Sequence, residues 1–137
     1  MTVKDYLGQC GTLETEIKAK LEQVEHLRTL VTRANANWKS GGFNPMPYDK
    51  VGEITAKIVD LEKEINSEID RLIDLQTEIQ GYTAAMPYDK ARLVIDLHYI
   101  NGLSFGEIAT REARDIRTIF RWHEKGLKFL EKTLKIS

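Results

Sequence analysis

The sequence predicts an all-α protein in which a long antiparallel helical hairpin precedes a small helical domain. Two stretches of about 30 residues repeat apolar side chains at heptad spacing. Gly and Pro together account for 12 of the 137 residues, so few positions interrupt a helix. Two helix-start signals follow each other closely near the C-terminus. We expect the hairpin to occupy residues 1–82 and the small domain to occupy residues 83–137.

The net charge of −1 hides an uneven distribution of charged side chains. Residues 1–89 carry 10 basic and 15 acidic side chains, whereas residues 90–137 carry 10 basic and 6 acidic ones. A basic C-terminal end indicates an anionic partner, most often nucleic acid, although a solvated helix face has the same composition.

The single cysteine, Cys10, excludes an internal disulfide and a metal site built from several thiolates. Cys10 occupies a heptad position, so we expect it to be a small core residue. No apolar run is long enough to span a membrane. Asp5 and Gln9 interrupt the stretch where a signal peptide is apolar. These features predict a cytoplasmic protein with no membrane partner.

Residues 3–33 and 51–82 form the two predicted long helices. In an antiparallel pair the apolar stripe of each helix covers that of the other. Two polar residues interrupt these stripes, Lys20 in the first helix and Glu68 in the second. We expect them to meet as a pair that sets the register of the two helices. Apolar flanks that stay exposed favour a homodimer. The predicted exposed flanks are Leu7, Leu21, Ile69 and Ile73. The candidate oligomerisation residues are Ile17, Leu21, Val24, Ile58, Leu61, Ile65 and Leu72.

The connection between these helices, residues 34–50, combines turn-forming residues with large apolar side chains. We expect these side chains to pack onto the end of the hairpin, and the alternative is a loop that contacts a partner. The side chains in question are Trp38, Phe43, Met46 and Tyr48.

The last third of the chain predicts three shorter helices. Gly81 is expected to close the second long helix, and a third helix follows Pro87 and ends at Asn101-Gly102. Ser104 and Glu107 match a capping box, which predicts a short helix from residue 105. Asp115 is a natural N-cap for a final helix from Ile116 to about Thr133.

The final helix has an apolar stripe and a cationic outer face, so the two last helices match the helix-turn-helix plan of DNA-binding proteins. Trp122 is expected to close the core rather than flank the DNA. The predicted buried stripe comprises Ile116, Ile119, Phe120, His123, Leu127 and Leu130. The predicted outer face comprises Arg114, Arg117, Thr118, Arg121 and Lys125.

The string LHYINGLSFGEIATREARDIRTIFRWHEKGLKFLEK resembles the promoter-reading C-terminal domain of bacterial sigma factors. The matching features are Y-x-x-G-L-S-[YF]-x-E-I-A at Tyr99 to Ala109 and a helix cap with Thr-Ile at Asp115 to Ile119. The whole chain is similar to small phage and prophage regulators of Gram-positive bacteria, of the ArpU and RinA type. The sequence departs from the sigma pattern at residues 112–114, where Ala113 replaces a turn glycine.

The helix-turn-helix prediction assigns a role in DNA binding to each residue of this outer face and to Ser104. Arg117, Thr118 and Arg121 are candidates for contacts with base edges in the major groove of double-stranded DNA. Phosphates are expected to meet Arg114, Lys125 and the helix end at Ser104. Dimerisation through residues 1–82 supplies a second half-site. The sigma resemblance implies RNA polymerase as a further partner.

Enzyme chemistry is not predicted, and neither a cofactor nor a metal is expected. His26, His98 and His123 lie in no metal-ligand spacing, and the last two are expected at helix packing contacts. No hydrolase, kinase or dinucleotide motif is present. Two alternatives to a transcription regulator stay open. One is a small terminase-like initiator of DNA packaging, and the other is a coiled-coil protein that binds, inhibits or scaffolds another protein.

Overall fold

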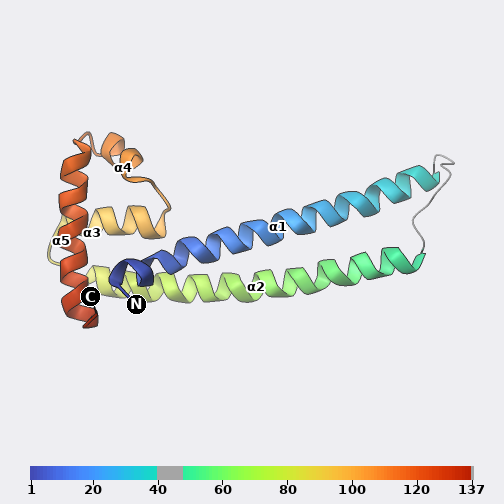
Figure 1. Ribbon diagram of the computed structural model, residues 1–137, viewed down its shortest axis with the longest axis horizontal. Coiled ribbons are helices and arrows are strands. Elements are labelled where there is room, and N and C mark those ends of the chain that lie inside the picture. Colours follow the sequence, from blue (N-terminus) through green and yellow to red (C-terminus); the bar gives the residue numbers. More distant parts are fainter. Residues whose placement is uncertain (40–47, 137) are drawn as a thin grey trace. The chain divides into compact units, whose positions relative to one another are not determined.

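The computed structural model describes residues 1–39 and 48–136, and all regular structure in this part of the chain is helical (Figure 1). The prediction of an all-α protein is therefore confirmed. No helix among the described residues is both long enough and apolar enough to cross a membrane. The elements in chain order are α1 (Val3–Lys39), α2 (Tyr48–Ala84), α3 (Asp89–Ile95), the π-helical turn η1 (Asp96–Ile100), α4 (Phe105–Arg111) and α5 (Ile116–Leu134).

Helices α1 and α2 both extend beyond the ranges that their heptad patterns predict. Gly81 does not end α2, which continues to Ala84. Thr83 is 1% exposed and donates a hydrogen bond from Oγ1 to Oδ1 of Asp96 at 2.9 Å. This tertiary contact holds the last turn of α2 and offsets the roughly 1 kcal/mol that a glycine costs inside a helix. The predicted packing of the aromatic side chains in the connection concerns side chains outside the described residues.

Residues Glu14–Arg71 form one compact unit, made of parts of α1 and α2. The buried apolar side chains of this unit are Ile17, Val24, Ile54 and Ile65. Lys20 forms an ion pair with Glu68 and lies 3.3 Å from Glu64. These hydrogen bonds and charges raise the pKa of Lys20. An exposed ion pair joins Arg28 to Glu62. The predicted meeting of Lys20 and Glu68 is confirmed.

Residues Met1–Leu13 and Leu72–Ser137 form the second compact unit. Its main core combines the start of α1 and the end of α2 with α3 and α5 (Figure 1). The buried members are Val3, Leu7, Cys10, Ile79, Met86, Ala91, Ile95, Leu127 and Leu130. The predicted burial of Cys10 is confirmed. The predicted exposure of Leu7 is wrong, because α3 and α5 contribute to a core that covers it.

Two contacts define how this core is closed. The hydroxyl of Tyr6 donates a hydrogen bond to Oε1 of Glu78 at 2.6 Å, which links α1 to α2. Burial and the Glu78 contact raise the pKa of Tyr6. At the contact between α3 and α5, a Cβ atom at Gly126 would lie 2.8 Å from Cγ1 of Ile95. Glycine therefore allows a closer approach of these helices than a larger residue does.

A smaller core lies among α3, η1, α4 and α5. Its buried members are Val94, Leu97, Ile108 and Ile119. Trp122 is half-buried and packs against this cluster, which confirms its predicted position at the core. The cluster attaches the short helix α4 to α5 and so positions the segment in which the candidate DNA contacts lie.

Candidate nucleic-acid interface

The first element of the candidate site is the capped start of α4. The backbone N–H of Glu107 donates to Oγ of Ser104 at 3.1 Å, and the N–H of Ser104 donates to Oε1 of Glu107 at 3.2 Å. The predicted capping box is therefore confirmed. Ser104 is exposed, so the start of α4 faces solvent.

The turn from α4 to α5 closes around Ala113, whose φ angle is +53°. The N–H of Ala113 donates to the carbonyl of Thr110 at 3.2 Å, and the N–H of Arg114 donates to that of Ala109 at 3.0 Å. These two bonds form a Schellman motif, a helix ending that usually carries glycine at the left-handed position. Ala113 thus occupies the left-handed position of this turn, where glycine is the usual residue.

Helix α5 begins directly after this turn. Oδ1 of Asp115 accepts a hydrogen bond from the N–H of Arg117 at 3.4 Å, and the carbonyl of Asp115 accepts one from the N–H of Thr118 at 2.9 Å. The predicted N-cap at Asp115 is confirmed. The capped start places Arg117, Thr118 and Arg121 in the first two turns of the helix.

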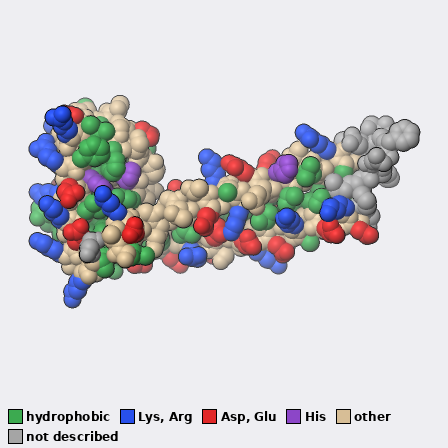
Figure 2. Space-filling model, viewed as in Figure 1, with side chains coloured by type: hydrophobic (Ala, Val, Ile, Leu, Met, Phe, Trp, Pro, Cys, Tyr) green, Lys and Arg blue, Asp and Glu red, His purple; other side chains and the backbone are tan. Residues whose placement is uncertain are grey.

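The predicted base-reading residues lie close together on α5. Arg117 and Arg121 are exposed, whereas Thr118 is half-buried. Nη2 of Arg121 donates to Oγ1 of Thr118 at 3.2 Å, so the threonine helps to orient the guanidinium. Figure 2 shows Lys and Arg side chains along the part of the surface that α5 forms.

The two predicted phosphate contacts from this region rest against aromatic rings. The guanidinium of Arg114 lies 5.9 Å from the centre of the Trp122 ring. Nζ of Lys125 lies 4.0 Å from the centre of the Tyr88 ring. Cation–π contacts of this kind restrain long basic side chains at a surface. Sequence reasoning missed the role of Tyr88, because no local spacing relates it to Lys125.

The buried stripe of α5 is narrower than the apolar pattern predicts. Ile116 is 40% exposed and Phe120 is 47% exposed, so both predictions of burial are wrong. Gly126 is buried instead, although it was not in the predicted stripe. The physical reason is that α4 has only seven residues: it shares a core cluster with Ile119 but leaves Ile116 and Phe120 partly uncovered. The spacing of apolar residues along one helix does not reveal how far its neighbour extends.

Beneath this surface, histidines and aromatic rings form a packed cluster. Nε2 of His123 lies 2.7 Å from the hydroxyl of Tyr99, and the ring of His98 stacks on Phe105 with a centroid distance of 4.0 Å. Burial lowers the pKa of His123 to about 4 and raises the pKa of Tyr99 to about 12. The Tyr99 hydroxyl and Nε2 of neutral His123 share this hydrogen bond, and the tautomer of the imidazole decides which group donates. The predicted placement of His98 and His123 at packing contacts is confirmed.

The candidate oligomerisation residues differ in exposure. Ile17, Val24 and Ile65 are buried within the chain itself, whereas Leu21 is 51% exposed. Ile58, Leu61 and Leu72 are half-buried. Self-association through these residues stays a prediction. Within residues 14–71 the most exposed apolar side chains besides Leu21 include Val59, which is 45% exposed.

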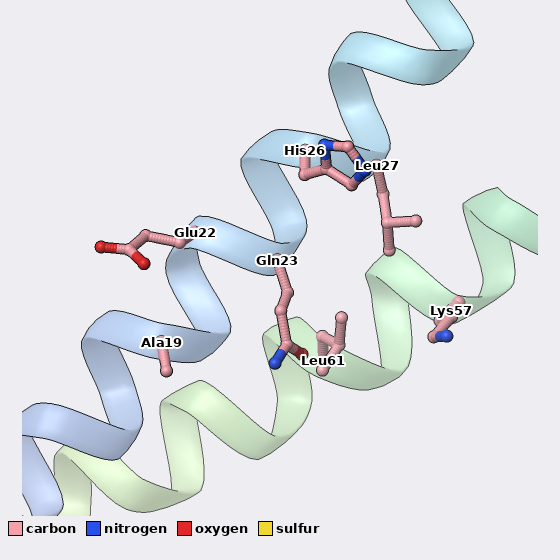
Figure 3. Close-up of a pocket in the computed structure, with 7 residues that line it drawn as sticks. All are labelled: Ala19, Glu22, Gln23, His26, Leu27, Lys57 and Leu61. Atoms are coloured by element: carbon pink, nitrogen blue, oxygen red, sulfur yellow. The ribbon is translucent and has the colours of Figure 1, made fainter.

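A cavity of about 470 Å³ lies between α1 and α2 in the unit formed by residues 14–71 (Figure 3). Gln23, Leu27 and Leu61 lie in the space between the two helices, whereas Glu22 points away from α2. No group of three or more His, Cys, Asp or Glu side chains that could hold a metal occurs in the part of the chain that the structure describes. The cavity brings together none of the predicted DNA-contacting residues.

No protein-family model, curated protein or solved structure matches this chain. The resemblance to sigma factors and to phage regulators therefore stays a prediction from the sequence.

Proposed function

We propose that the protein is a sequence-specific DNA-binding transcription regulator of phage or prophage genes. In this proposal residues 1–82 form a helical hairpin and the C-terminal helices form a sigma-like helix-turn-helix. Helix α5 lies in the major groove, which is wide enough to admit one helix. The sigma resemblance implies RNA polymerase as a second partner.

The observation that carries the proposal is the exposed arginine pair Arg117 and Arg121 at the capped start of α5. Helix α5 contains five Lys or Arg residues and two Glu residues. A short helix precedes it and is attached through a shared apolar cluster. An exposed cationic face near the N-terminal end of a helix, held by a second helix, fits the way in which helix-turn-helix proteins meet DNA.

We assign the base-edge contacts to Arg117, Thr118 and Arg121. Arginine donates two parallel hydrogen bonds to the edge of guanine, the commonest specific contact in the major groove. Thr118 supports this assignment indirectly, because it accepts a hydrogen bond from Arg121 and restrains it. Phosphate contacts are assigned to Arg114, Lys125 and the start of α4 at Ser104.

Dimerisation through the N-terminal helices completes the proposal. A single small module binds one operator weakly at physiological salt, whereas two linked modules bind two half-sites about 34 Å apart. The exposed side chains of Leu21 and Val59 provide apolar surface for such a contact. Sedimentation equilibrium of the purified chain measures the oligomeric state. A dimer agrees with the regulator, and a closed ring favours DNA packaging.

Gel shifts at low salt test DNA binding directly. The double variant Arg117→Ala/Arg121→Ala is expected to lose sequence-specific binding, because it removes both proposed base contacts. The matched control Arg33→Ala/Arg71→Ala removes two exposed arginines from the unit formed by residues 14–71. It is expected to bind DNA like the parent protein. Absence of a shift with every duplex, or an equal loss in both double variants, contradicts the proposal and favours the protein-binding alternative.

A further inference from the structure

Two apolar side chains lie on the proposed reading surface of α5. Ile116 is 40% exposed and Phe120 is 47% exposed. They are four residues apart in one helix, so they lie on the same face, one turn after the other. Arg117 and Arg121 follow them directly in the sequence and are also exposed. An apolar strip therefore runs beside two cations in the first turns of α5.

The ring of Phe120 is held in place from below. It contacts Phe105 edge-on with a centroid distance of 5.3 Å, and Phe105 stacks on His98 at 4.0 Å. Nδ1 of His98 donates to the carbonyl of Leu103 at 2.7 Å, which orients the imidazole. The exposed ring of Phe120 is thus the outer member of a group of three packed rings, Phe120, Phe105 and His98. A surface that is already ordered loses little conformational entropy when a ligand covers it.

The positive charges of Arg117 and Arg121 limit the kinds of molecule that can bind over this apolar strip. An occupant must carry negative charge for Arg117 and Arg121 and also present an apolar group to Ile116 and Phe120. In the major groove the phosphates and the acceptor atoms of guanine meet the first requirement, and the C5-methyl group of thymine meets the second. No other standard base places a methyl group in that groove.

We propose that Ile116 and Phe120 form an apolar contact site for the C5-methyl group of thymine. This inference rests on the proposed function, because it assumes that α5 enters the major groove. The arginines recognise hydrogen-bond acceptors, and the two apolar side chains add a preference for thymine at neighbouring positions. The operator consequently contains thymine next to a base that an arginine recognises.

The test compares thymine with deoxyuridine, which differs only by the missing methyl group. The probe is the duplex recovered from random sequences by selection with the purified full-length protein. Each thymine is replaced by deoxyuridine in turn, and affinity is measured by fluorescence anisotropy. Loss of one buried methyl group is expected to weaken binding about fourfold at the contacted position. Other positions are expected to change little.

Variants of the protein test whether Ile116 and Phe120 cause the difference in affinity between thymine and deoxyuridine. Phe120→Ala is expected to reduce the thymine-to-deoxyuridine ratio at the contacted position to about one, while Phe120→Leu retains most of it. Lys128→Ala, which removes an exposed cation from the same helix, is expected to weaken both duplexes equally. Thermal unfolding checks that each variant folds. The measurement on the parent protein needs no variant, so the inference stays testable if Phe120→Ala does not fold.

The outcomes separate this inference from the proposed function. If a duplex is bound specifically but every deoxyuridine replacement leaves the affinity unchanged, the methyl contact is wrong and the DNA-binding function stands. The same conclusion follows if Phe120→Ala and Ile116→Ala both keep the full ratio. If no duplex is bound specifically, both proposals fail.

Discussion

Lys20 of α1 and Glu68 of α2 form an ion pair between the two helices, and Nζ of Lys20 also lies 3.3 Å from Glu64. The side chain of Glu68 is 13% exposed. Its Oε2 atom is buried and has no hydrogen-bond partner in the part of the chain that the structure describes. The carboxylate of Glu68 therefore depends on a single lysine for its charge compensation.

Replacing Lys20 by Met is expected to destabilise the protein, because Glu68 then stays buried without a cation. The double variant Lys20→Met/Glu68→Leu is expected to recover much of this loss, since an apolar pair then replaces the ion pair. Urea denaturation followed by circular dichroism measures the effect. Arg28→Met is the control, because the pair of Arg28 with Glu62 is exposed and contributes less than about 1 kcal/mol. Equal midpoints for Lys20→Met and Arg28→Met contradict the prediction.

Leu7→Ala is expected to lower the free energy of unfolding by about 2–5 kcal/mol, because it leaves a cavity in the core shared by α1, α2, α3 and α5. Leu7 is 1% exposed, whereas Leu21 of the same helix is 51% exposed. Leu21→Ala is therefore expected to change this free energy by about 0.5 kcal/mol or less. Urea denaturation at low protein concentration compares the two. A small effect of Leu7→Ala shows that the start of α1 does not complete this core.

Ala113→Gly is expected to stabilise the protein by about 0.5–1 kcal/mol. The φ angle of Ala113 is +53°, a conformation that costs an alanine free energy and costs a glycine almost none. The greater flexibility of glycine in the unfolded chain offsets part of this gain. The melting temperature of Ala113→Gly should rise, and that of Ala113→Val should fall. A fall for both variants shows that the turn does not depend on the left-handed conformation.

Acid is expected to destabilise the protein through His123. Burial, together with nearby His98 and Lys4, lowers the pKa of His123 from its ordinary value of 6.5 to about 4. Between these two values the unfolded chain binds a proton that the native protein excludes, so the free energy of unfolding falls as the pH falls. The loss is at most about 3 kcal/mol. This loss of stability is complete below the pKa of His123 in the native protein.

The variant His123→Gln isolates this effect, because the glutamine amide can accept a hydrogen bond from Tyr99 or donate one to it but does not titrate. The urea midpoints of the parent and of His123→Gln are measured between pH 7 and pH 4. Carboxylates titrate in both proteins, so only the difference between the two curves reports on the imidazole. Parallel curves show that His123 is not buried in its neutral form.

Local signals predicted the helices and their caps. The capping box at Ser104 and the N-cap at Asp115 depend on residues three or fewer positions apart, and both were predicted from the sequence. The meeting of Lys20 and Glu68 followed from heptad spacing and equal helix lengths. The partners in each cap lie within one helical turn of each other. The register of Lys20 against Glu68 is determined by the heptad repeat of the two long helices.

Contacts between distant segments decided the rest of the candidate site. The ring support beneath Phe120 comes from α4 and η1, and the restraint on Lys125 comes from Tyr88. Neither contact follows from the apolar pattern of α5. The helical period shows which face of α5 is apolar, but it does not show how much of that face a neighbouring helix covers. The predicted stripe therefore included Ile116 and Phe120, which the short α4 leaves exposed.

The sequence by itself determined that this protein is helical, where α4 and α5 begin, and that positive charge collects on the last helix. The tertiary structure alone decided that Leu7 belongs to the same core as α3 and α5, that α2 continues past Gly81, and that Gly126 admits Ile95. The physical reason is the range of the interactions. Capping and periodicity act within a few residues, whereas burial depends on which remote side chains occupy the same space.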